Sequence, residues 1–594
     1  MAEMKTREMQ YMVGRRALSP LAPMSTGGPN GFGAEMFDTQ SLVNTLAAMP
    51  DVSVVRIVRR SGLETLSTSP GVSNDIIVIR TSDPARADYL EALAQRNSSL
   101  ILERDHLLQH LGSFRPQSLG LQRNPAHVTA AAVPVRFHVQ DIVGQAVPHA
   151  EVVVYSDTGI EDQGETDAQG DATISVRGGF LNHVAAVYVK PAANYWERFT
   201  ERPALESDGV NSIVLQPLEL FSPARFPGNP FFGWGQRIMG LLDLDLQQCT
   251  GAGARVAIID SGCDITHPAL QHITIGRDYT NLDPKSHQPN PTTWSTDVIS
   301  HGTHCAGVIA GNGADGHIRG FAPKAEVHIL KVFPGGAFNN LIAAINYCMD
   351  NDVHVVNCSL GSDVDSQLVA QAIDRARQAG VALFVAAGNS ADAVQFPARV
   401  PGVLCVSALG QAGNVPDYTY HARTVPAGVT IVNGQVYPAQ FTCHGPQVAA
   451  CAPGVGIISC VPGGGYAAWD GTSMADPHLT GLGALLAAHH PELSRMKVRG
   501  APWVDRLMNL VLGAAQATGL DPQFGGAGLP IASRALGAEF VPQSVWSSQI
   551  QQRFAPELID ELAKAVIKLM PRDPAATADQ PGTRGERTAR SAKH

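Results

Sequence analysis

The stretch VAIIDSGCDITHPAL, residues 256–270, decides the fold of this chain. It begins as an apolar, β-branched run, which predicts a strand buried on both faces, as in a parallel sheet. Asp260 ends this run, so its carboxylate should lie at the C-terminal end of the strand. Open α/β sheets place their functional crevices at that edge. Gly262 suits a tight exit from the strand.

Three later segments supply polar groups that suit the same edge. HGTHCAGVIAG has small residues and apolar ones at helical spacing, which predicts a helix packed on the sheet with His301 at its N-terminal end. VALFVAAGNS is an apolar strand followed by small residues and Asn389. GTSMADPH places Ser473 at the start of a helix that continues through LTGLGALLAAHH. In chain order, the segments supply a carboxylate, an imidazole, an amide and a hydroxyl.

These four groups match the needs of acyl transfer. A serine hydroxyl is a weak nucleophile until an imidazole takes its proton, and the imidazole needs a carboxylate to orient it and stabilise its charge. We therefore predict Asp260, His301 and Ser473 as catalytic residues, with Asn389 in the oxyanion hole beside the backbone N–H of Ser473. With this chain order, the sequence resembles the subtilisin-like serine peptidases, or subtilases.

The resemblance covers roughly residues 226–536 and implies a fold and a substrate site. The implied α/β fold is subtilisin-like: a mostly parallel sheet with helices on both faces. VHVVNCSLGS resembles the family's substrate-binding strand, on which an extended peptide would pair as an added strand. The substrate-binding residues implied in this way are Ser359, Leu360, Gly361, Ala387 and Gly388.

The chain departs from the family pattern in three places. Ser300 precedes the predicted catalytic histidine where the family usually has glycine, and Asp476 stands where it usually has serine. An ionised Asp476, one helical turn from Ser473, would oppose a developing oxyanion unless it turned away or were paired. The insertion between residues 407 and 441 is either a solvated hairpin or part of a pocket.

Composition narrows the function classes. A chain of 594 residues predicts several domains. A net charge of −10 and a pI near 6.0 argue against general binding to nucleic acid or anionic membranes. No run approaches the roughly 18 apolar residues of a membrane span. The N-terminal residues lack the apolar core of a secretory signal, so we expect a cytoplasmic location and leave export by another route open.

Cysteines and histidines outside the predicted triad are expected to be structural. The cysteine spacings fit no zinc signature, so buried, reduced thiols are the default interpretation, with disulfides left open. Cys305 lies four residues after His301 on the same helix face, either inert or reachable by a thiol reagent. No metal ligand is predicted, His267, His304 and His478 included. The cysteines are at positions 249, 263, 305, 348, 358, 405, 443, 451 and 460.

Domain boundaries follow from composition and periodicity. The composition of residues 1–48 predicts a disordered leader. Residues 49–118 are expected to form a small α+β unit, which is either weakly similar to subtilase propeptide inhibitors or an unrelated module. Residues 128–218 predict an all-β sandwich-like module resembling carboxypeptidase-regulatory or transthyretin-like modules. The catalytic domain spans 226–538. Residues 539–594 predict an amphipathic helix, with Leu558 and Leu562 near one face, and a disordered tail.

The sequence as a whole predicts a serine endopeptidase acting on proteins or peptides. The alternatives are a dedicated processing peptidase for one partner protein and a non-catalytic binding scaffold on a peptidase fold. No cofactor is required, while the resemblance leaves a structural calcium ion open. The sandwich module or the C-terminal helix would supply any partner surface, with no nucleic acid and no membrane span involved.

Overall fold

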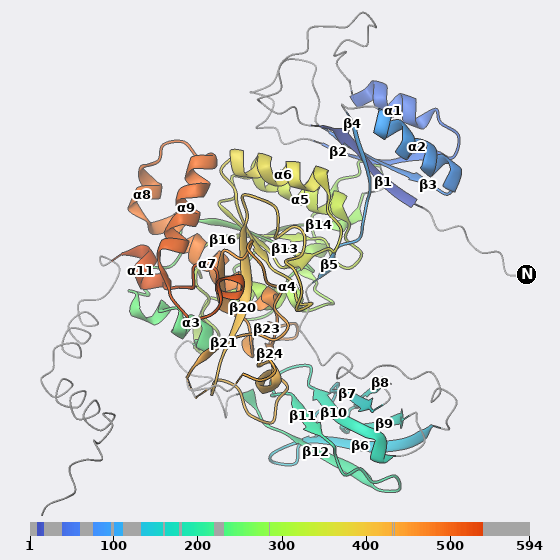
Figure 1. Cartoon of the computed structure of the whole chain (residues 1–594). Coiled ribbons are helices and arrows are strands. Elements are labelled where there is room, and N and C mark those ends of the chain that lie inside the picture. The colour runs from blue at the N-terminus through green and yellow to red at the C-terminus, as the bar shows by residue number, and fades with distance from the viewer. Residues whose placement is uncertain are drawn as a thin grey trace, which may run out of the picture. The chain divides into compact units, whose positions relative to one another are not determined.

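The architecture is known from a computed structural model (Figure 1), in which the chain divides into two units, the first spanning Met1–Phe540. The second unit, Val541–His594, and with it the expected C-terminal helix and tail, lies outside the described residues. The structure describes residues 9–16, 39–59, 75–96, 100–110, 132–157, 161–176, 181–218, 231–283, 285–429, 432 and 434–537.

A nine-stranded, mostly parallel sheet organises the C-terminal half of the described chain, which confirms the predicted fold class. Its order is β15-β14-β16-β13-β17-β19-β20-β21, and β22 also pairs with β20. Only the β14·β15 and β20·β21 pairs of this sheet are antiparallel. The strands are β13 (Arg255–Asp260), β14 (Ile275–Leu282), β15 (Pro289–Asn290), β16 (Glu326–Lys331), β17 (Val355–Cys358), β19 (Ala382–Ala386), β20 (Leu404–Gln411), β21 (Val436–Pro438) and β22 (Ala450–Pro453).

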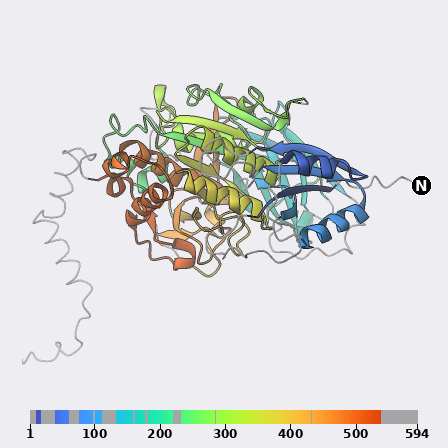
Figure 2. The ribbon, with the colours of Figure 1, turned by 90° about the horizontal axis from the view of Figure 1, so that it is seen from above.

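Helices cover both faces of this sheet because its strands are apolar on both sides. In β13, Val256 and Ile258 belong to one hydrophobic core, and Ala257 and Ile259 belong to the other. The first core includes residues of α4 (His301–Ala310) and α7 (Thr472–His489). The second includes α5 (Phe338–Asp350) and α6 (Gln367–Gln378), which run side by side in Figures 1 and 2.

Short elements complete this half of the chain. β23 and β24 form a hairpin that leads into α7, β18 pairs with β5, and β25 pairs with β26. These elements are α3 (Trp234–Ile238), β18 (Leu360–Gly361), β23 (Ile457–Val461), β24 (Gly465–Trp469), α8 (Pro491–Arg495), α9 (Ala501–Gly513), β25 (Ala515–Gln516), α10 (Pro522–Gly525), β26 (Leu529–Pro530) and α11 (Ala532–Leu536).

The N-terminal elements correct one prediction. Residues 9–15 form β1 in the centre of an antiparallel sheet of order β2-β3-β1-β4, and residues 39–47 form α1, so the described parts of the expected leader are not disordered. Tyr11 and Met12 are fully buried, so the strand is part of a core. The elements are β1 (Met9–Arg15), α1 (Thr39–Ala47), β2 (Val52–Val58), β3 (Ile76–Thr81), α2 (Pro84–Arg96), β4 (Leu100–Arg104) and β5 (Gln109–His110).

Residues 133–215 form two β-sheets around a shared core. The sheet orders are β11-β10-β7-β8 and β12-β6-β9. Val135, Val154 and Val187 are among the buried residues that fill the space between them. The strands are β6 (Val133–Asp141), β7 (Glu151–Ser156), β8 (Glu161–Glu165), β9 (Asp171–Val176), β10 (Val184–Lys190), β11 (Arg198–Glu201) and β12 (Val210–Leu215). We call this part the sandwich.

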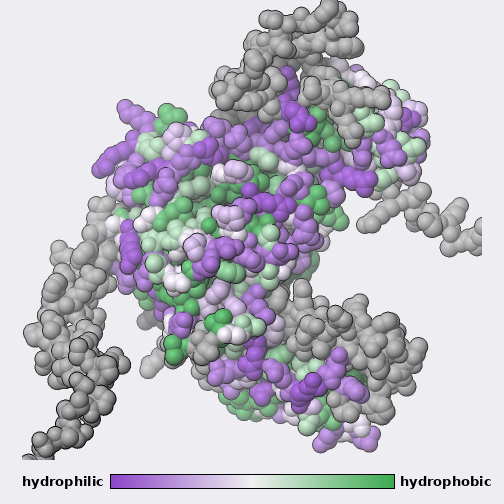
Figure 3. Space-filling model, in the orientation of Figure 1, coloured by the Kyte–Doolittle hydropathy of each residue, from purple (hydrophilic) through white to green (hydrophobic). Residues whose placement is uncertain are grey.

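The exterior of the described residues is mixed in character. On the face shown in Figure 3, hydrophilic residues are spread widely and small hydrophobic areas interrupt them. Among the described helices, none is long and apolar enough to cross a membrane.

Candidate active site

The site is built around a buried pair of Asp260 and His301. Asp260 is the last residue of β13, and His301 is the first residue of α4, as the sequence predicts. The His301 Nδ1 atom lies 2.8 Å from Asp260 Oδ1 and 2.9 Å from Oδ2. A Cβ atom on Gly302 would lie 2.2 Å from the Gly262 carbonyl oxygen, so this close approach of helix to strand requires glycine. The pair is thereby held out of solvent.

Asp297 fixes the start of α4, a role that the sequence analysis missed. Its Oδ2 atom accepts from Thr303 N (2.9 Å) and Oγ1 (2.7 Å), and its Oδ1 atom accepts from Ser300 N at 2.8 Å. Ser300 has a φ of +70°, in the left-handed region that favours glycine. This conformation explains why a glycine suits this position, and the Asp297 hydrogen bond holds serine in it. The spacing D-x-x-S-H was the available signal.

Ser473 lies where the start of α7 meets α4 and the end of β17. It is the second residue of α7 and is fully buried. Its hydroxyl donates to the Ser359 carbonyl oxygen at 3.3 Å. Its own carbonyl oxygen accepts from Ser359 Oγ at 3.2 Å and from the Cys305 thiol at 3.5 Å. Ser473 is therefore tied to the residue predicted to begin the substrate-binding strand.

Thr472 orients the side chain of Asn389. The Thr472 backbone N–H and hydroxyl both donate to Asn389 Oδ1, at 2.9 and 2.8 Å. Since an N–H can only donate, the accepting atom must be the amide oxygen, so Nδ2 is the group of Asn389 that can donate. The preceding Gly388 has a φ of +117°, and a Cβ there would lie 2.6 Å from Gln395 Oε1. Ala387 is buried before it.

The strand predicted to bind substrate is occupied by the chain itself. β18 pairs antiparallel with β5, with Leu360 opposite His110 and Gly361 opposite Gln109. On the other side of the same segment, Leu108 N donates to Gly336 O at 2.8 Å. Residues 105–110 thus lie as a middle strand between two segments of the catalytic domain. No sequence pattern marked the segment that contains Gly336 as the one that pairs with the other side of residues 105–110.

Two side chains of this inserted segment reach into the site. The His110 ring lies 5.9 Å from the His301 ring and 5.8 Å from the Phe333 ring, measured between centroids. Leu108 is 6% exposed and packs in the hydrophobic core that includes α5, whereas its neighbour Leu107 is 62% exposed. The segment therefore places one aromatic side chain against the candidate base and one aliphatic side chain in an apolar recess.

Two carboxylates cap the helices beside the inserted segment. Asp105 Oδ1 accepts from Asn339 N, in the first turn of α5, at 3.0 Å. Glu103 accepts from Gln367 N at 3.0 Å and Leu368 N at 3.2 Å, in the first turn of α6. The N-terminus of a helix attracts negative charge. These caps, which sequence reasoning missed, tie the N-terminal sheet to the catalytic domain.

Asp476 is buried behind Ser473. Burial raises the pKa of its carboxyl well above the ordinary value; polar groups of Cys358 and Ser359 act in the opposite direction, and the nearby Asp260 charge adds a smaller increase. Because burial dominates, the neutral acid is the favoured form. The expected conflict between an ionised Asp476 and an oxyanion is thereby removed. The residue is a departure from the family pattern that burial accommodates.

The three other histidines singled out in the sequence contact backbone carbonyls. His304 Nε2 lies 3.0 Å from the Ile457 carbonyl oxygen, and its ring stacks on Trp469 at 4.7 Å. Burial lowers the pKa of His304 to about 3 and that of His478 to about 4, so both are neutral. His267 is also buried, 3.0 Å from the Gly465 carbonyl oxygen. These contacts support structural roles.

All nine cysteines are buried and unpaired. The pKa of the Cys305 thiol is raised well above its ordinary value, chiefly by burial and next by Asp260. Ligand atoms of Asp260, His301 and Cys305 lie within 4.8 Å of one another, the one such group of three among the described residues. A thiol, an imidazole and a single carboxylate do not suit calcium, which prefers oxygen ligands.

A parallel α/β sheet that carries a buried Asp–His pair at its carboxyl edge, with a serine at the start of a facing helix, defines the class of subtilisin-like serine hydrolases. The comparison with protein families agrees, since the model of the subtilase family matches residues 251–525. The chain belongs to the subtilase family, a family of serine endopeptidases.

Individual relatives support this membership. The chain is 32% identical to a subtilisin from Bacillus pumilus over 264 residues, 43% of this chain and 84% of the relative. It is 32% identical to a thermostable alkaline protease from Halalkalibacterium halodurans over 270 residues, 45% of this chain but only 65% of that protein. It spans 61% of subtilisin E from Bacillus subtilis.

A solved structure shares the fold. The crystal structure of fervidolysin from Fervidobacterium pennivorans, described as a keratinolytic enzyme related to subtilisin, matches with a TM-score of 0.51 and 19% identity. The match covers 91% of this chain and 62% of fervidolysin. At this identity the likeness concerns the fold alone.

Replacing Asp476 by asparagine tests its protonation state. Because the folded-state pKa of Asp476 is raised, native protein loses stability as pH rises from the unfolded-state pKa, near 3.9, toward the folded-state pKa. Asp476→Asn removes that loss. Its unfolding free energy relative to wild type should therefore increase with pH over this window, by up to about 1.4 kcal/mol per pH unit.

Thermal or urea unfolding at pH 4, 6 and 8 measures this difference. The control is Asp374→Asn, at an exposed position of α6, for which we expect a difference that does not change with pH. A constant difference between Asp476→Asn and wild type at every pH would contradict a neutral Asp476.

Proposed function

We propose that the chain is a serine endopeptidase in which Ser473 attacks the peptide carbonyl, His301 takes and returns the proton, and Asp260 orients the imidazole. The observation that carries this proposal is the buried contact of His301 Nδ1 with both Asp260 carboxylate oxygens, at 2.8 and 2.9 Å. That contact fixes the tautomer in which Nε2 is available to accept a proton.

We propose that the Ser473 hydroxyl turns toward His301 when the serine reacts. In the structure the Ser473 hydroxyl donates to Ser359 O at 3.3 Å, a long hydrogen bond to a neutral acceptor. Rotation about the Cα–Cβ bond of Ser473 redirects the hydroxyl without moving the backbone, which Ser359 Oγ and the Cys305 thiol hold through the Ser473 carbonyl. The rotation exchanges one weak bond for the contact with His301.

Asn389 and the backbone N–H of Ser473 form the proposed oxyanion hole. The double hydrogen bond from Thr472 to Asn389 Oδ1 supports this role, since it fixes the amide with Nδ2 as donor before any charge develops. A preorganised donor stabilises an oxyanion more effectively than one that must reorient.

Substrates are proposed to bind as extended peptides between β18 and the segment that contains Gly336. The chain's own residues 108–110 pair with these two walls. Main-chain pairing recognises an extended backbone with little demand on sequence, and the recess filled by Leu108 adds a preference for an aliphatic side chain. Such a site suits proteins or peptides in general.

The same observation supports inhibition in cis by the N-terminal sheet. β5 occupies the substrate strand, His110 lies against His301, and Glu103 and Asp105 cap two helices at the site. The register runs from Gly361 through Leu360 toward Ser359, so the inserted strand is directed toward Ser473. We propose that this segment occludes the cleft and that self-hydrolysis occurs close after His110.

Replacing Ser473 or His301 by alanine tests the catalytic assignment. Each variant should lose peptide hydrolysis by on the order of 10⁶-fold, the magnitude established for subtilisin, a relative, rather than one derived from this chain. The double variant should lose little more than either single variant, because the residues act as one unit. Turnover of a fluorogenic peptide and labelling by a fluorophosphonate measure these effects.

Ser533→Ala, in α11 and away from the site, is the matched control and should retain wild-type turnover and labelling. Full hydrolysis by Ser473→Ala would rule out the assigned nucleophile. Failure of the wild type to react with the probe would favour the alternative of a non-catalytic scaffold.

Replacing Asn389 by alanine tests the oxyanion donor. Since its hydrogen bond strengthens only in the transition state, kcat should fall by about 10² to 10³-fold while KM stays nearly constant; this range is also that of subtilisin. Steady-state kinetics on one peptide separate the two parameters. A raised KM with an unchanged kcat would instead assign Asn389 to ground-state binding.

Removing residues 1–115 from protein that has already folded tests the proposed inhibition. Peptide hydrolysis should rise when this part is removed and fall when it is added back as a separate segment. Within the full chain, Leu108→Asp should raise hydrolysis by at least tenfold, because about 2 kcal/mol of apolar burial is lost and a charge cannot enter the recess.

Leu107→Asp is the matched control, since the adjacent side chain is 62% exposed and should leave hydrolysis unchanged. Mass measurement of the same samples detects any cleavage after His110. Equal activity with and without residues 1–115 would make the N-terminal sheet a folding aid or partner module instead of an inhibitor.

A further inference from the structure

The sandwich contacts the strand that leads into Ser473. Asn194 N donates to Tyr466 O at 2.6 Å, and Tyr466 N donates to Asn194 Oδ1 at 3.0 Å. Tyr466 belongs to β24, whose last residue, Trp469, lies four positions before the candidate nucleophile. A β-sandwich that acted only as a spacer would have no reason to bond to this strand.

A buried polar cluster connects the same parts of the chain. Glu197, between β10 and β11, accepts through Oε1 from Tyr420 N at 3.0 Å and His421 N at 3.2 Å. Its Oε2 accepts from the Tyr188 hydroxyl. The Nδ1 atom of His421 lies 3.6 Å from Glu197 Oε1 and 2.8 Å from Asp470 Oδ1. Tyr420 and His421 belong to the insertion whose role the sequence left open.

The two carboxyl groups and the imidazole of this cluster are out of solvent. The side chains of Glu197, His421 and Asp470 are 7%, 2% and 1% exposed. A buried carboxylate is costly unless a cation compensates it, and losing one partner of such a group leaves an uncompensated charge. The compensating group for Asp470 is His421, and Glu197 lies near the same Nδ1 atom and accepts from the His421 backbone N–H.

Asp470 ties the cluster to the candidate catalytic residues. Its Oδ1 atom accepts from Gly456 N at 2.6 Å and lies 2.8 Å from His421 Nδ1, so the side chain is held by two contacts. Two residues later, Thr472 makes the hydrogen bonds that orient Asn389, and Ser473 follows. A displacement of Asp470 therefore moves both the proposed nucleophile and the residue that orients the proposed oxyanion donor.

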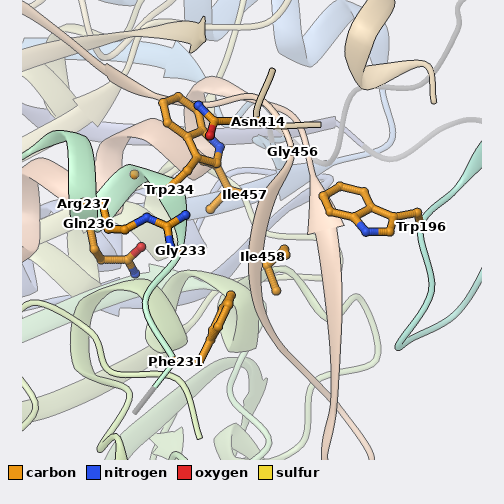
Figure 4. Close-up of a pocket in the computed structure, with 11 residues that line it drawn as sticks. Trp196, Phe231, Gly233, Trp234, Gln236, Arg237, Asn414, Gly456, Ile457 and Ile458 are labelled. Carbon is orange, nitrogen blue, oxygen red and sulfur yellow. The ribbon is translucent and has the colours of Figure 1, made fainter. Parts of the chain in front are cut away.

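The surrounding groups favour a protonated His421. Burial opposes the charge, but Asp470 and then Glu197 outweigh it and raise the pKa of His421 to about 9, with Lys190 acting in the opposite direction. The Trp196 ring meets His421 edge-on at 5.9 Å. Trp196 also lines a pocket with residues 456–458 (Figure 4).

We propose that the sandwich contributes to peptide hydrolysis: Glu197 holds His421 against Asp470 and so positions the segment that carries Ser473. This proposal rests on the proposed peptidase function and assigns Glu197 as a positioning residue, not a catalytic one. Peptide hydrolysis then depends on a residue that lies outside the catalytic domain.

The test compares Glu197→Gln with Glu201→Gln in the full chain. Glutamine keeps the size of Glu197 and one of its two acceptor oxygens but removes its charge. Glu201, in the sandwich, also forms an ion pair with the insertion, to Arg423 at 3.2 Å. Because the Glu201 side chain is 60% exposed, losing its charge should have no measurable effect on hydrolysis. For Glu197→Gln we expect kcat to fall by about tenfold or more with KM nearly unchanged, since small displacements of a catalytic group cost up to about 10²-fold.

The pH dependence of kcat distinguishes this positioning role from a purely structural one, which would leave the pH dependence unchanged. With Glu197 neutralised, His421 loses its proton at lower pH, so the alkaline limb of kcat should shift to lower pH in Glu197→Gln and stay at the wild-type position in Glu201→Gln. Tyr188→Phe removes only the hydroxyl that donates to Glu197, so kcat should fall by less than in Glu197→Gln. This variant serves as the test if Glu197→Gln does not fold.

The outcomes separate this proposal from the proposed function. If the wild type hydrolyses no peptide and binds no fluorophosphonate, the peptidase assignment fails. If the wild type is active while Glu197→Gln, or Tyr188→Phe in its place, matches it in kcat and in the alkaline limb, the positioning role of Glu197 is overturned. Equal losses in Glu197→Gln and Glu201→Gln would also overturn it.

Discussion

The buried contact between Asp260 and His301 is the constraint on which the rest of the site depends. A carboxylate withdrawn from water is tolerated only when a partner compensates it, and here that partner must come from another element. The contact therefore requires β13 to end at Asp260, α4 to begin at His301, and the chain to pass close enough that only glycine fits at position 302. Asp297 then holds the first turn of α4 in place.

Helix beginnings recur around this pair. α4 starts at His301, and α7 starts one residue before Ser473. The first turns of α5 and α6 donate backbone hydrogen bonds to the carboxylates of Asp105 and Glu103. Unpaired N–H groups at each start attract negative charge. The fold thus gathers donors at one edge of the sheet, where Asp105 of the inserted segment and Glu103 of β4 accept hydrogen bonds from them.

The sequence predicted those parts of the site that local patterns encode. Asp260 at a strand end, His301 at a helix start and the helix after Ser473 follow from apolar periodicity and small residues, and the structure has them there. The strand at residues 9–15 was missed because it pairs with β3 and β4, more than 60 residues away, and seven isolated residues carry no sign of a distant partner.

Contacts between distant segments were equally invisible. The carboxylate of Glu197 and the imidazole of His421 are separated by more than 200 residues of chain, and neither sits in a recognisable motif. Asp476 was correctly singled out as a departure, but whether it is ionised depends on burial, which periodicity does not reveal. Spacing locates the residues of this site, while their charge states depend on what packs around them.

The order of elements along the chain has a consequence for biosynthesis. Every strand that pairs with β1, β2 or β3 in the N-terminal sheet lies before residue 105, so all of its pairing partners have left the ribosome long before Ser473 is translated. Chains fold from the N-terminus as they emerge. The sheet that carries the inserted segment can therefore form before Ser473 is translated, whereas β5 pairs only after β18 has been translated.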